Sequence, residues 1–219
     1  MAAAPSQSSP ASAHAPQAST NAPPAPAKSP RAAGERALDA AGDALLIIDV
    51  LNDLEFDTGP ALLRSAWPAA QRIHRLKAGV KARGAPVIYV NDNWGQWRSD
   101  MRQVVAHCLR DGVRGQALAA LLAPEEDDYI VIKSRHSGFF GTSLELLLQH
   151  LGARSLILTG LTTDICVLFT AHDAYLRRYD LRVPADCVAC AEAEPHRWAL
   201  RHMAEVCRAD IAAAKESPA

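Results

Sequence analysis

The sequence predicts an α/β fold of three layers, in which a mainly parallel six-stranded sheet lies between two layers of helices. Short apolar runs recur along the chain, and they are continuous rather than alternating, as expected of parallel strands covered on both faces. Amphipathic helical segments separate these runs, and strands alternating with helices are typical of βαβ crossovers. With 219 residues, the chain has room for one such domain and a tail.

The expected strands are the short apolar runs of the chain. They are, in order, Ala44–Val50, Pro86–Val90, Tyr129–Lys133, Ser155–Gly160 and Asp180–Val188, with a weaker sixth at Ala209–Ala213. Each run has the length of an ordinary strand, and helical segments lie between them.

Helices are expected between and after these strands, and three of them have clear boundaries. The first, Pro68–Arg83, has proline in its first turn and stops before a glycine. The second, Thr142–Leu151, opens with a Thr-Ser-Leu-Glu capping box and carries a stripe of leucines. The third, Pro195–Arg208, again starts with proline. The segment Asn91–Pro124 is expected to be irregular, and long irregular connections in compact domains are often binding elements.

The amino-terminal segment differs in composition from the rest of the chain. Its first thirty residues contain 10 Ala, 7 Pro and 6 Ser, with a single charged side chain, Lys28. Such a segment buries too little apolar surface to offset its ordering entropy. It also lacks the apolar stretch of a secretory signal. We expect a disordered tail over residues 1–37 and a folded domain over residues 38–215.

Charge and cysteine content restrict the partners and the compartment. The 23 Lys and Arg nearly balance the 24 Asp and Glu, which gives no support to nucleic acid or an anionic membrane as partner. No run approaches the roughly 18 consecutive apolar residues that a membrane span needs. Five cysteines are an odd number without regular spacing, so we expect a reducing, cytoplasmic setting rather than a disulfide framework.

Three chemically useful side chains are expected at one edge of the sheet. Ligands bind beyond the carboxyl ends of the strands in open α/β sheets. Asp49 and Lys133 lie at the ends of two expected strands, and Cys166 follows a third by a few residues, in the first turn of the next helix. An acid, an amine and a thiol therefore converge from three separate parts of the chain.

This combination favours nucleophilic acyl transfer. A helix amino terminus and the ammonium of Lys133 would both lower the pKa of the Cys166 thiol, and Asp49 could act as general base and acid. The backbone N–H groups of Thr162 and Cys166 could hold an oxyanion. Taken singly, each residue has a simpler interpretation. A buried cysteine is more often a small hydrophobe, a lone Asp a turn residue and a lone Lys a solvated side chain.

The sequence resembles the isochorismatase-like cysteine hydrolases. The matching blocks are ALLIIDVLNDL (Ala44–Leu54), VIKSRHSGFFGT (Val131–Thr142) and LTGLTTDICVLFTAHDAY (Leu158–Tyr175). The resemblance implies a Rossmann-like αβα fold, a catalytic triad of Asp49, Lys133 and Cys166, and a cis peptide at Leu161–Thr162. It also implies that Phe139 lines the pocket.

Departures from the family pattern limit the reactions that we expect of this chain. Members with nicotinamidase activity hold a divalent metal through histidines after the second strand, whereas Asn91–Trp97 contains none. We therefore expect neither a metal nor another cofactor. Family members that cleave a vinyl ether do without the nucleophilic cysteine, so the presence of Cys166 favours C–N hydrolysis. Further substrate contacts are expected from Asn93, Trp94 and His136, and from Arg98 or Arg135 for a substrate carboxylate.

The resulting prediction is a metal-independent cysteine hydrolase that cleaves a small amide, carbamoyl or ureido substrate through a thioester. Two alternatives stay open: vinyl-ether hydrolysis with Asp49 and Lys133 alone, and a non-catalytic binding protein. The helix that carries Cys166 is apolar nearly all round, which predicts burial in the core or against another subunit. As relatives usually form oligomers, we expect a homo-oligomer, either a dimer or a tetramer. The other expected partner is a small-molecule substrate.

Overall fold

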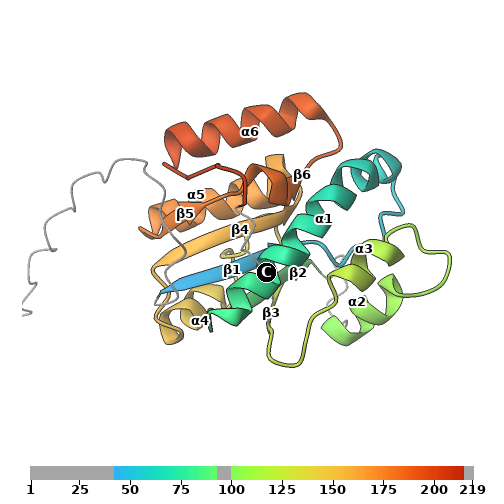
Figure 1. The fold of residues 1–219 in the computed structure, drawn as a ribbon, viewed down its shortest axis with the longest axis horizontal. Coiled ribbons are helices and arrows are strands. Elements are labelled where there is room, and N and C mark those ends of the chain that lie inside the picture. Colours follow the sequence, from blue (N-terminus) through green and yellow to red (C-terminus); the bar gives the residue numbers. More distant parts are fainter. Residues whose placement is uncertain (1–41, 93–99, 215–219) are drawn as a thin grey trace, which may run out of the picture. The chain divides into compact units, whose positions relative to one another are not determined.

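The computed structural model describes residues 42–92 and 100–214, which lie within one compact unit, Glu35–Ala219. Within these residues the predicted α/β class is confirmed, with six strands that all pair in parallel (Figure 1). The strand order is β3-β2-β1-β4-β5, and β6 pairs with the end of β4. None of the described helices is long and apolar enough to cross a membrane.

The strands are β1 (Asp43–Ile48), β2 (Val87–Asp92), β3 (Tyr129–Lys133), β4 (Ser155–Leu161), β5 (Asp180–Arg182) and β6 (Val188–Ala189). The α-helices are α1 (Gly59–Ala82), α2 (Met101–Cys108), α3 (Gln116–Leu121), α4 (Leu144–His150), α5 (Leu168–Leu176) and α6 (Ala193–Val206). A π-helical turn, Thr163–Val167, connects β4 to α5, and a 3₁₀ turn, Ala185–Cys187, precedes β6.

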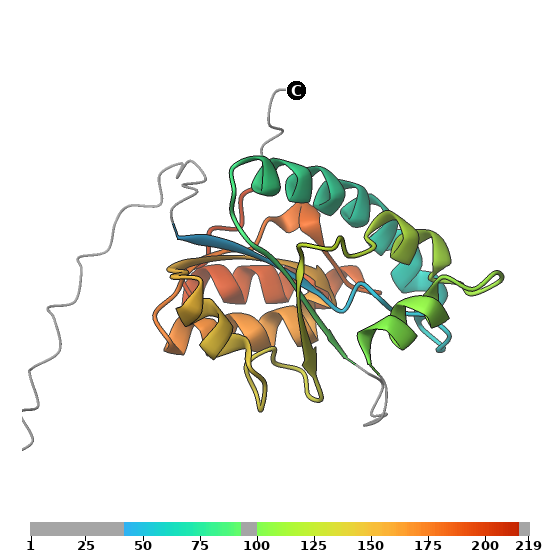
Figure 2. The same ribbon diagram turned by 90° about the horizontal axis from the view of Figure 1, so that it is seen from below.

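Helices cover both faces of the sheet, as Figure 2 shows. The side chains of β1 explain how, because they alternate between two separate cores. Leu45 and Ile47 pack with residues of α1, α2 and α3. Leu46 and Ile48 pack with residues of α4, α5 and α6 on the opposite face. Since both faces are buried, the strand is apolar at every position from Ala44 to Ile48, which is the pattern that predicted a parallel sheet.

Gly160 allows the two central strands to approach each other. It lies in β4 opposite Ile48 of β1, and its φ of 109° is a conformation that side-chain-bearing residues rarely adopt. A Cβ atom at this position would lie 2.0 Å from the Ile48 carbonyl oxygen. Glycine is therefore required at this position of β4, shortly before the turn that carries Cys166.

The fifth and sixth strands differ from the prediction. The run expected to be one strand, Asp180–Val188, is split by Pro184 and a 3₁₀ turn into the short strands β5 and β6. Proline cannot donate a ladder hydrogen bond, which accounts for the break. The run Ala209–Ala213, expected as the sixth strand, makes only an isolated bridge between Arg182 and Asp210.

The helices also differ at their ends. Helix α1 begins at Gly59 rather than at Pro68, which lies inside it, and Pro60 takes the first-turn position instead. Helix α4 begins at Leu144, two residues later than expected, and lacks the predicted capping box; instead the Thr142 hydroxyl accepts the Leu144 N–H at 3.1 Å. The segment expected to be irregular, Asn91–Pro124, contains α2 and α3.

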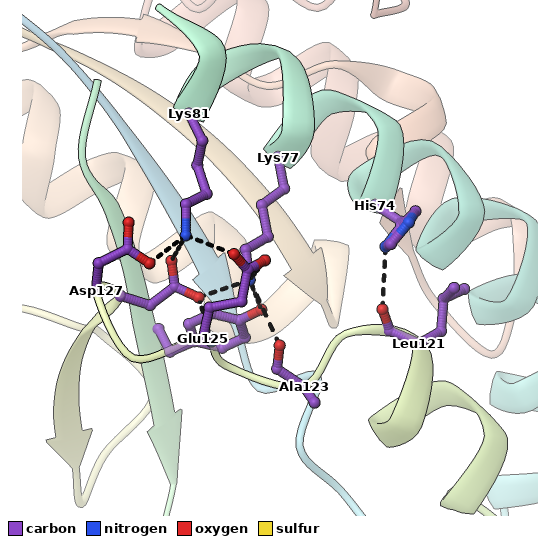
Figure 3. A network of polar contacts seen from close by, with 9 residues as sticks. His74, Lys77, Lys81, Leu121, Ala123, Glu125 and Asp127 are labelled. Carbon is purple, nitrogen blue, oxygen red and sulfur yellow. Dashed lines mark hydrogen bonds and ion pairs between the residues drawn. The ribbon is translucent and has the colours of Figure 1, made fainter. Parts of the chain in front are cut away.

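A polar network fastens α1 to the loop before β3 (Figure 3). Lys77 Nζ lies 2.6 Å from Asp128 Oδ2 and 3.2 Å from the Tyr89 hydroxyl. Both side chains of the Lys77–Asp128 pair are at least 95% buried, and Lys81 extends the network to Glu125 and to Asp128. The acidic run before β3, residues 125–128, is thus partly an internal anchor. It lies at the amino edge of the sheet, beside a hollow of about 450 Å³.

Candidate active site

Asp49 and Lys133 form a buried ion pair at the carboxyl edge of the sheet. Lys133 Nζ lies 2.7 Å from Asp49 Oδ2, and the two residues are 1% and 8% exposed. Asp49 follows β1 directly and has a φ of 51°, a strained conformation for a residue with a side chain. Its other oxygen, Oδ1, accepts the Asp92 N–H at 2.8 Å. The carboxylate is therefore held from β2 and β3 at once.

The ammonium of Lys133 has three close partners, which matches its three N–H donors. Besides Asp49, it donates to the Arg135 carbonyl at 3.1 Å and lies 3.5 Å from Cys166 Sγ. The three predicted residues are thus brought together from three segments that lie far apart in the sequence. The Asp49 carboxylate is also close enough to the Cys166 thiol to raise its pKa, and Lys133 contacts both of these side chains.

Cys166 lies in a π-helical turn, not in the first turn of an α-helix as predicted. The N–H groups of Ile165 and Val167 both donate to the Thr162 carbonyl at 3.2 Å, whereas the Cys166 N–H between them does not make this bond. The peptide bond Leu161–Thr162 is cis, as the resemblance implied. Because α5 begins two residues later, Cys166 still precedes the amino terminus of a helix.

The electrostatics of the cluster correct one prediction. Burial and the nearby Asp49 charge raise the pKa of the Cys166 thiol to about 12, and Lys133 offsets only part of this increase. Burial also raises the pKa of Asp49, although Lys133 opposes that change. The sequence predicted a thiolate formed in advance. The structure instead has a thiol beside an Asp–Lys ion pair, so the proton must leave Cys166 during the reaction.

Thr170 of α5 connects the segment after Lys133 to the turn of Cys166. Its hydroxyl donates to the Cys166 carbonyl at 2.7 Å and accepts the Gly138 N–H at 3.0 Å, in a fully buried position. A second bond runs parallel to it, from the Ser137 hydroxyl to Asp173 Oδ2 at 2.5 Å. These two contacts hold the loop after β3 against α5, and they therefore fix the separation between Lys133 and Cys166.

Thr170→Val is expected to lower the free energy of unfolding by about 1–3 kcal/mol, because the Gly138 N–H loses its buried acceptor. Urea unfolding of the two proteins measures this difference. Thr170→Ser keeps the hydroxyl and loses one methyl group, so its loss should be near 1 kcal/mol. Turnover should fall about tenfold or more in the valine variant alone, since small displacements of reacting groups are costly. Equal stability and turnover in the valine and serine variants would contradict this assignment.

The other predicted substrate contacts lie on the loop after β3 or outside the described residues. The ring of Phe139 is buried, and its centroid lies 4.8 Å from the Arg177 guanidinium and 6.1 Å from the centroid of the Tyr179 ring. His136 is exposed after β3, with its ring 5.4 Å from the exposed ring of Phe169 on α5. Arg135 is exposed, and its carbonyl rather than its guanidinium faces Lys133. Three other predicted contacts, Asn93, Trp94 and Arg98, lie outside the described residues.

The sequence interpretation missed the residues that support the cluster. Asn91, at the end of β2, is 1% exposed and bonds both the N–H and the carbonyl of Leu51 at 3.0 Å. This contact shapes the chain just after Asp49. Two signals were available in the sequence: Asn91 is a polar residue at the end of a buried strand, and Thr170 places a hydroxyl in an apolar helix. Neither signal identifies the residue to which the side chain is hydrogen-bonded, because that residue is distant in the sequence.

A parallel αβα fold with an acid, an ammonium and a thiol at the carboxyl edge of its sheet defines a class of α/β hydrolases. Within that class, the chain belongs to the isochorismatase family: the model of the Isochorismatase domain matches residues 43–215. It is a hydrolase of this family.

Similar proteins cover nearly all of the folded part. The uncharacterized isochorismatase family protein YaaI of Bacillus subtilis (strain 168) is 38% identical over 174 residues, which are 80% of this chain and 95% of YaaI. Ureidoacrylate amidohydrolase RutB of Methylobacterium radiotolerans is 31% identical over 194 residues, 76% of this chain and 75% of RutB. The crystal structure of N-carbamoylsarcosine amidase from Thermoplasma acidophilum has a TM-score of 0.64 at 27% identity, covering 81% of this chain and 99% of that one.

Proposed function

We propose that the protein is a metal-independent cysteine hydrolase that cleaves a C–N bond of a small amide, carbamoyl or ureido compound. The observation that carries this proposal is the cluster of Asp49, Lys133 and Cys166, in which the ammonium of Lys133 contacts both the carboxylate and the sulfur. Two of the similar proteins bear the names of an amidohydrolase and an amidase, which supports the reaction type. The absence of histidine from residues 91–97 supports a mechanism without a metal.

In the proposed first half-reaction, Asp49 takes the Cys166 proton as the sulfur attacks the substrate carbonyl carbon. The new thiolate charge is stabilised by Lys133, 3.5 Å from the sulfur. The carbonyl oxygen becomes an oxyanion, for which the N–H groups of Thr162 and Cys166 are the proposed donors. The C–N bond then breaks, and Asp49 returns the proton to the leaving nitrogen, so that ammonia or an amine departs and a thioester remains.

In the second half-reaction, water attacks the thioester carbon. Asp49 takes a proton from this water, the C–S bond breaks, and the sulfur regains a proton as the acid product leaves. The raised pKa of Asp49 suits it to both roles, because a general base and acid works best when its pKa is closer to neutral. The raised pKa of Cys166 requires that its proton move to Asp49 as the sulfur attacks.

The proposal is tested by incubating the chain with a panel of small amides, carbamoyl compounds and ureides and measuring the release of ammonia or amine. A substrate should give multiple turnovers and, after rapid acid quenching, a mass increase of one acyl group on the peptide that contains Cys166. Release of the amine without this adduct, at every quench time, would exclude the thioester. No turnover on any member of the panel, with turnover on a vinyl ether, would favour the alternative chemistry.

A cytoplasmic location and a homo-oligomeric state belong to the same proposal. The helix that follows Cys166 exposes three large hydrophobic side chains, Phe169 at 51%, Tyr175 at 37% and Leu176 at 74%, and Ile165 in the preceding turn is 40% exposed. Large apolar side chains gathered on one element favour contact with another protein surface. A second subunit is the proposed partner of this surface.

A further inference from the structure

A pair of histidines lies between α5 and α6, and the proposed chemistry does not use it. His172 Nε2 of α5 is 3.0 Å from His202 Nε2 of α6, and the two ring centroids are 5.0 Å apart. Both side chains are half-buried, so the pair can be reached from solvent. Two neutral imidazoles that meet through their Nε2 atoms share one proton: one ring donates it and the other accepts it.

The separation of the two nitrogen atoms matches that of neighbouring ligands on one metal ion. With metal–nitrogen bonds of about 2.0–2.1 Å, two ligands at a right angle lie about 2.9 Å apart, and at a tetrahedral angle about 3.3 Å. The observed 3.0 Å falls between these values and nearer the right angle. Cu(II) and Ni(II) prefer this angle in square-planar or tetragonal sites with nitrogen ligands. An ion placed between the rings would replace the hydrogen bond, and the donor ring would then carry its proton on Nδ1 instead of Nε2.

The rings are also held in place from outside. The indole of Trp198, one turn earlier on α6, stacks on His202 with centroids 5.0 Å apart and planes at 19°. Fixing a ring orientation in advance favours metal binding, because less freedom is lost when the ion arrives. Within the described residues no group of three or more His, Cys, Asp and Glu side chains could hold a metal. The pair would thus supply two ligands and water the remainder.

We propose that His172 and His202 form a binding site for a divalent ion of the Cu(II) or Ni(II) type, which bridges α5 and α6. The site is independent of the proposed hydrolase activity, because its ligands are absent from the Asp49, Lys133 and Cys166 cluster. Bridging two helices that pack on the same face of the sheet would stabilise the folded state, since the ion binds the native arrangement and not the unfolded chain.

The test titrates the full chain, without an affinity tag, with Ni²⁺ and follows tryptophan fluorescence and the thermal unfolding temperature. Ni²⁺ is preferred to Cu²⁺ because it does not oxidise the five cysteines. Saturable partial quenching and a rise in the unfolding temperature are expected. His172→Gln and His202→Gln should each weaken binding at least tenfold, whereas His150→Gln, an exposed histidine on α4, should not change it. Trp198→Phe should remove most of the quenching and keep the rise in unfolding temperature.

The site would be refuted by Ni²⁺ binding of unchanged affinity in both the His172→Gln and the His202→Gln variant, which would indicate adventitious binding elsewhere. If the His172→Gln or the His202→Gln variant fails to fold, His172→Asn or His202→Asn takes its place. Loss of binding in Cys166→Ala would place the ion at the candidate active site and would also overturn the proposal. Because Ni²⁺ binding is measured without any substrate, its outcome is separate from that of the proposed hydrolase activity.

Discussion

Cys166→Ala is expected to abolish amide turnover, with kcat lowered by about 10³-fold or more. The alanine removes the atom that forms the thioester, and Asp49 and Lys133 then have no nucleophile to activate or stabilise. The members of such a cluster act as a unit, so the loss should appear in kcat rather than only in KM. The measurement is steady-state kinetics on a substrate identified by the amide and ureide panel.

A matched cysteine substitution separates a chemical effect from a structural one. Cys207, just after α6, is buried in the core that also includes residues of α5. Cys207→Ala should keep nearly full turnover in the fraction that folds. Retained activity in Cys166→Ala would refute the thioester mechanism and favour chemistry that uses Asp49 and Lys133 alone. Cys166→Ser tests the nucleophile further, because it keeps the size of the side chain and lacks the sulfur.

Asp49→Asn is expected to change turnover and thiol reactivity in opposite directions. Turnover should fall by about 10³-fold or more, because the amide cannot accept and return a proton. The same change removes a negative charge that raises the pKa of Cys166, and it leaves the ammonium of Lys133 beside the sulfur. The thiol pKa should therefore fall below its value of about 12, and alkylation of Cys166 at pH 8 should become faster.

The measurement is the rate of alkylation of each cysteine by iodoacetamide between pH 6 and 11, read by peptide mass spectrometry on the native protein. Each unit by which the thiol pKa falls raises the thiolate fraction at pH 8 about tenfold, as long as pH 8 lies below both pKa values. Lys133→Met should have the reverse effect on alkylation, because Lys133 lowers the pKa of Cys166. Slower alkylation in Asp49→Asn than in the wild type, with Cys207 unchanged in both, would contradict the electrostatic account.

The pH dependence of Cys166 alkylation in the wild type shows whether the free protein holds a thiolate or a protonated thiol. A thiolate formed in advance, as the sequence predicted, would give a midpoint below the value of about 8.5 for a free thiol. The structure predicts a midpoint well above it, since the sulfur is buried beside the Asp49 carboxylate. In this picture a slow reaction with an alkylating agent is compatible with catalysis, because Asp49 removes the proton only as the substrate is attacked.

The sequence by itself determined the fold class and the three residues of the candidate site. Continuous apolar runs identify strands that are buried on both faces, and such strands pair in parallel. Carboxyl ends of neighbouring parallel strands meet at one edge, which is why Asp49, Lys133 and Cys166 could be grouped without coordinates. The prediction needed only the position of each residue relative to its strand. It therefore survived errors such as the start of α1 and the division of the expected fifth strand.

Only the tertiary structure decided the protonation of the site and the contacts that hold it. The pKa of Cys166 depends on burial and on its distance from Asp49, 117 positions earlier in the numbering. The bonds of Thr170 to Gly138, the inward packing of Phe139 and the pairing of His172 with His202 likewise join separate elements. Local patterns fix which side of a strand or helix is apolar, but they contain no distances between elements. Desolvation and charge interactions depend on those distances, so they follow from the folded chain alone.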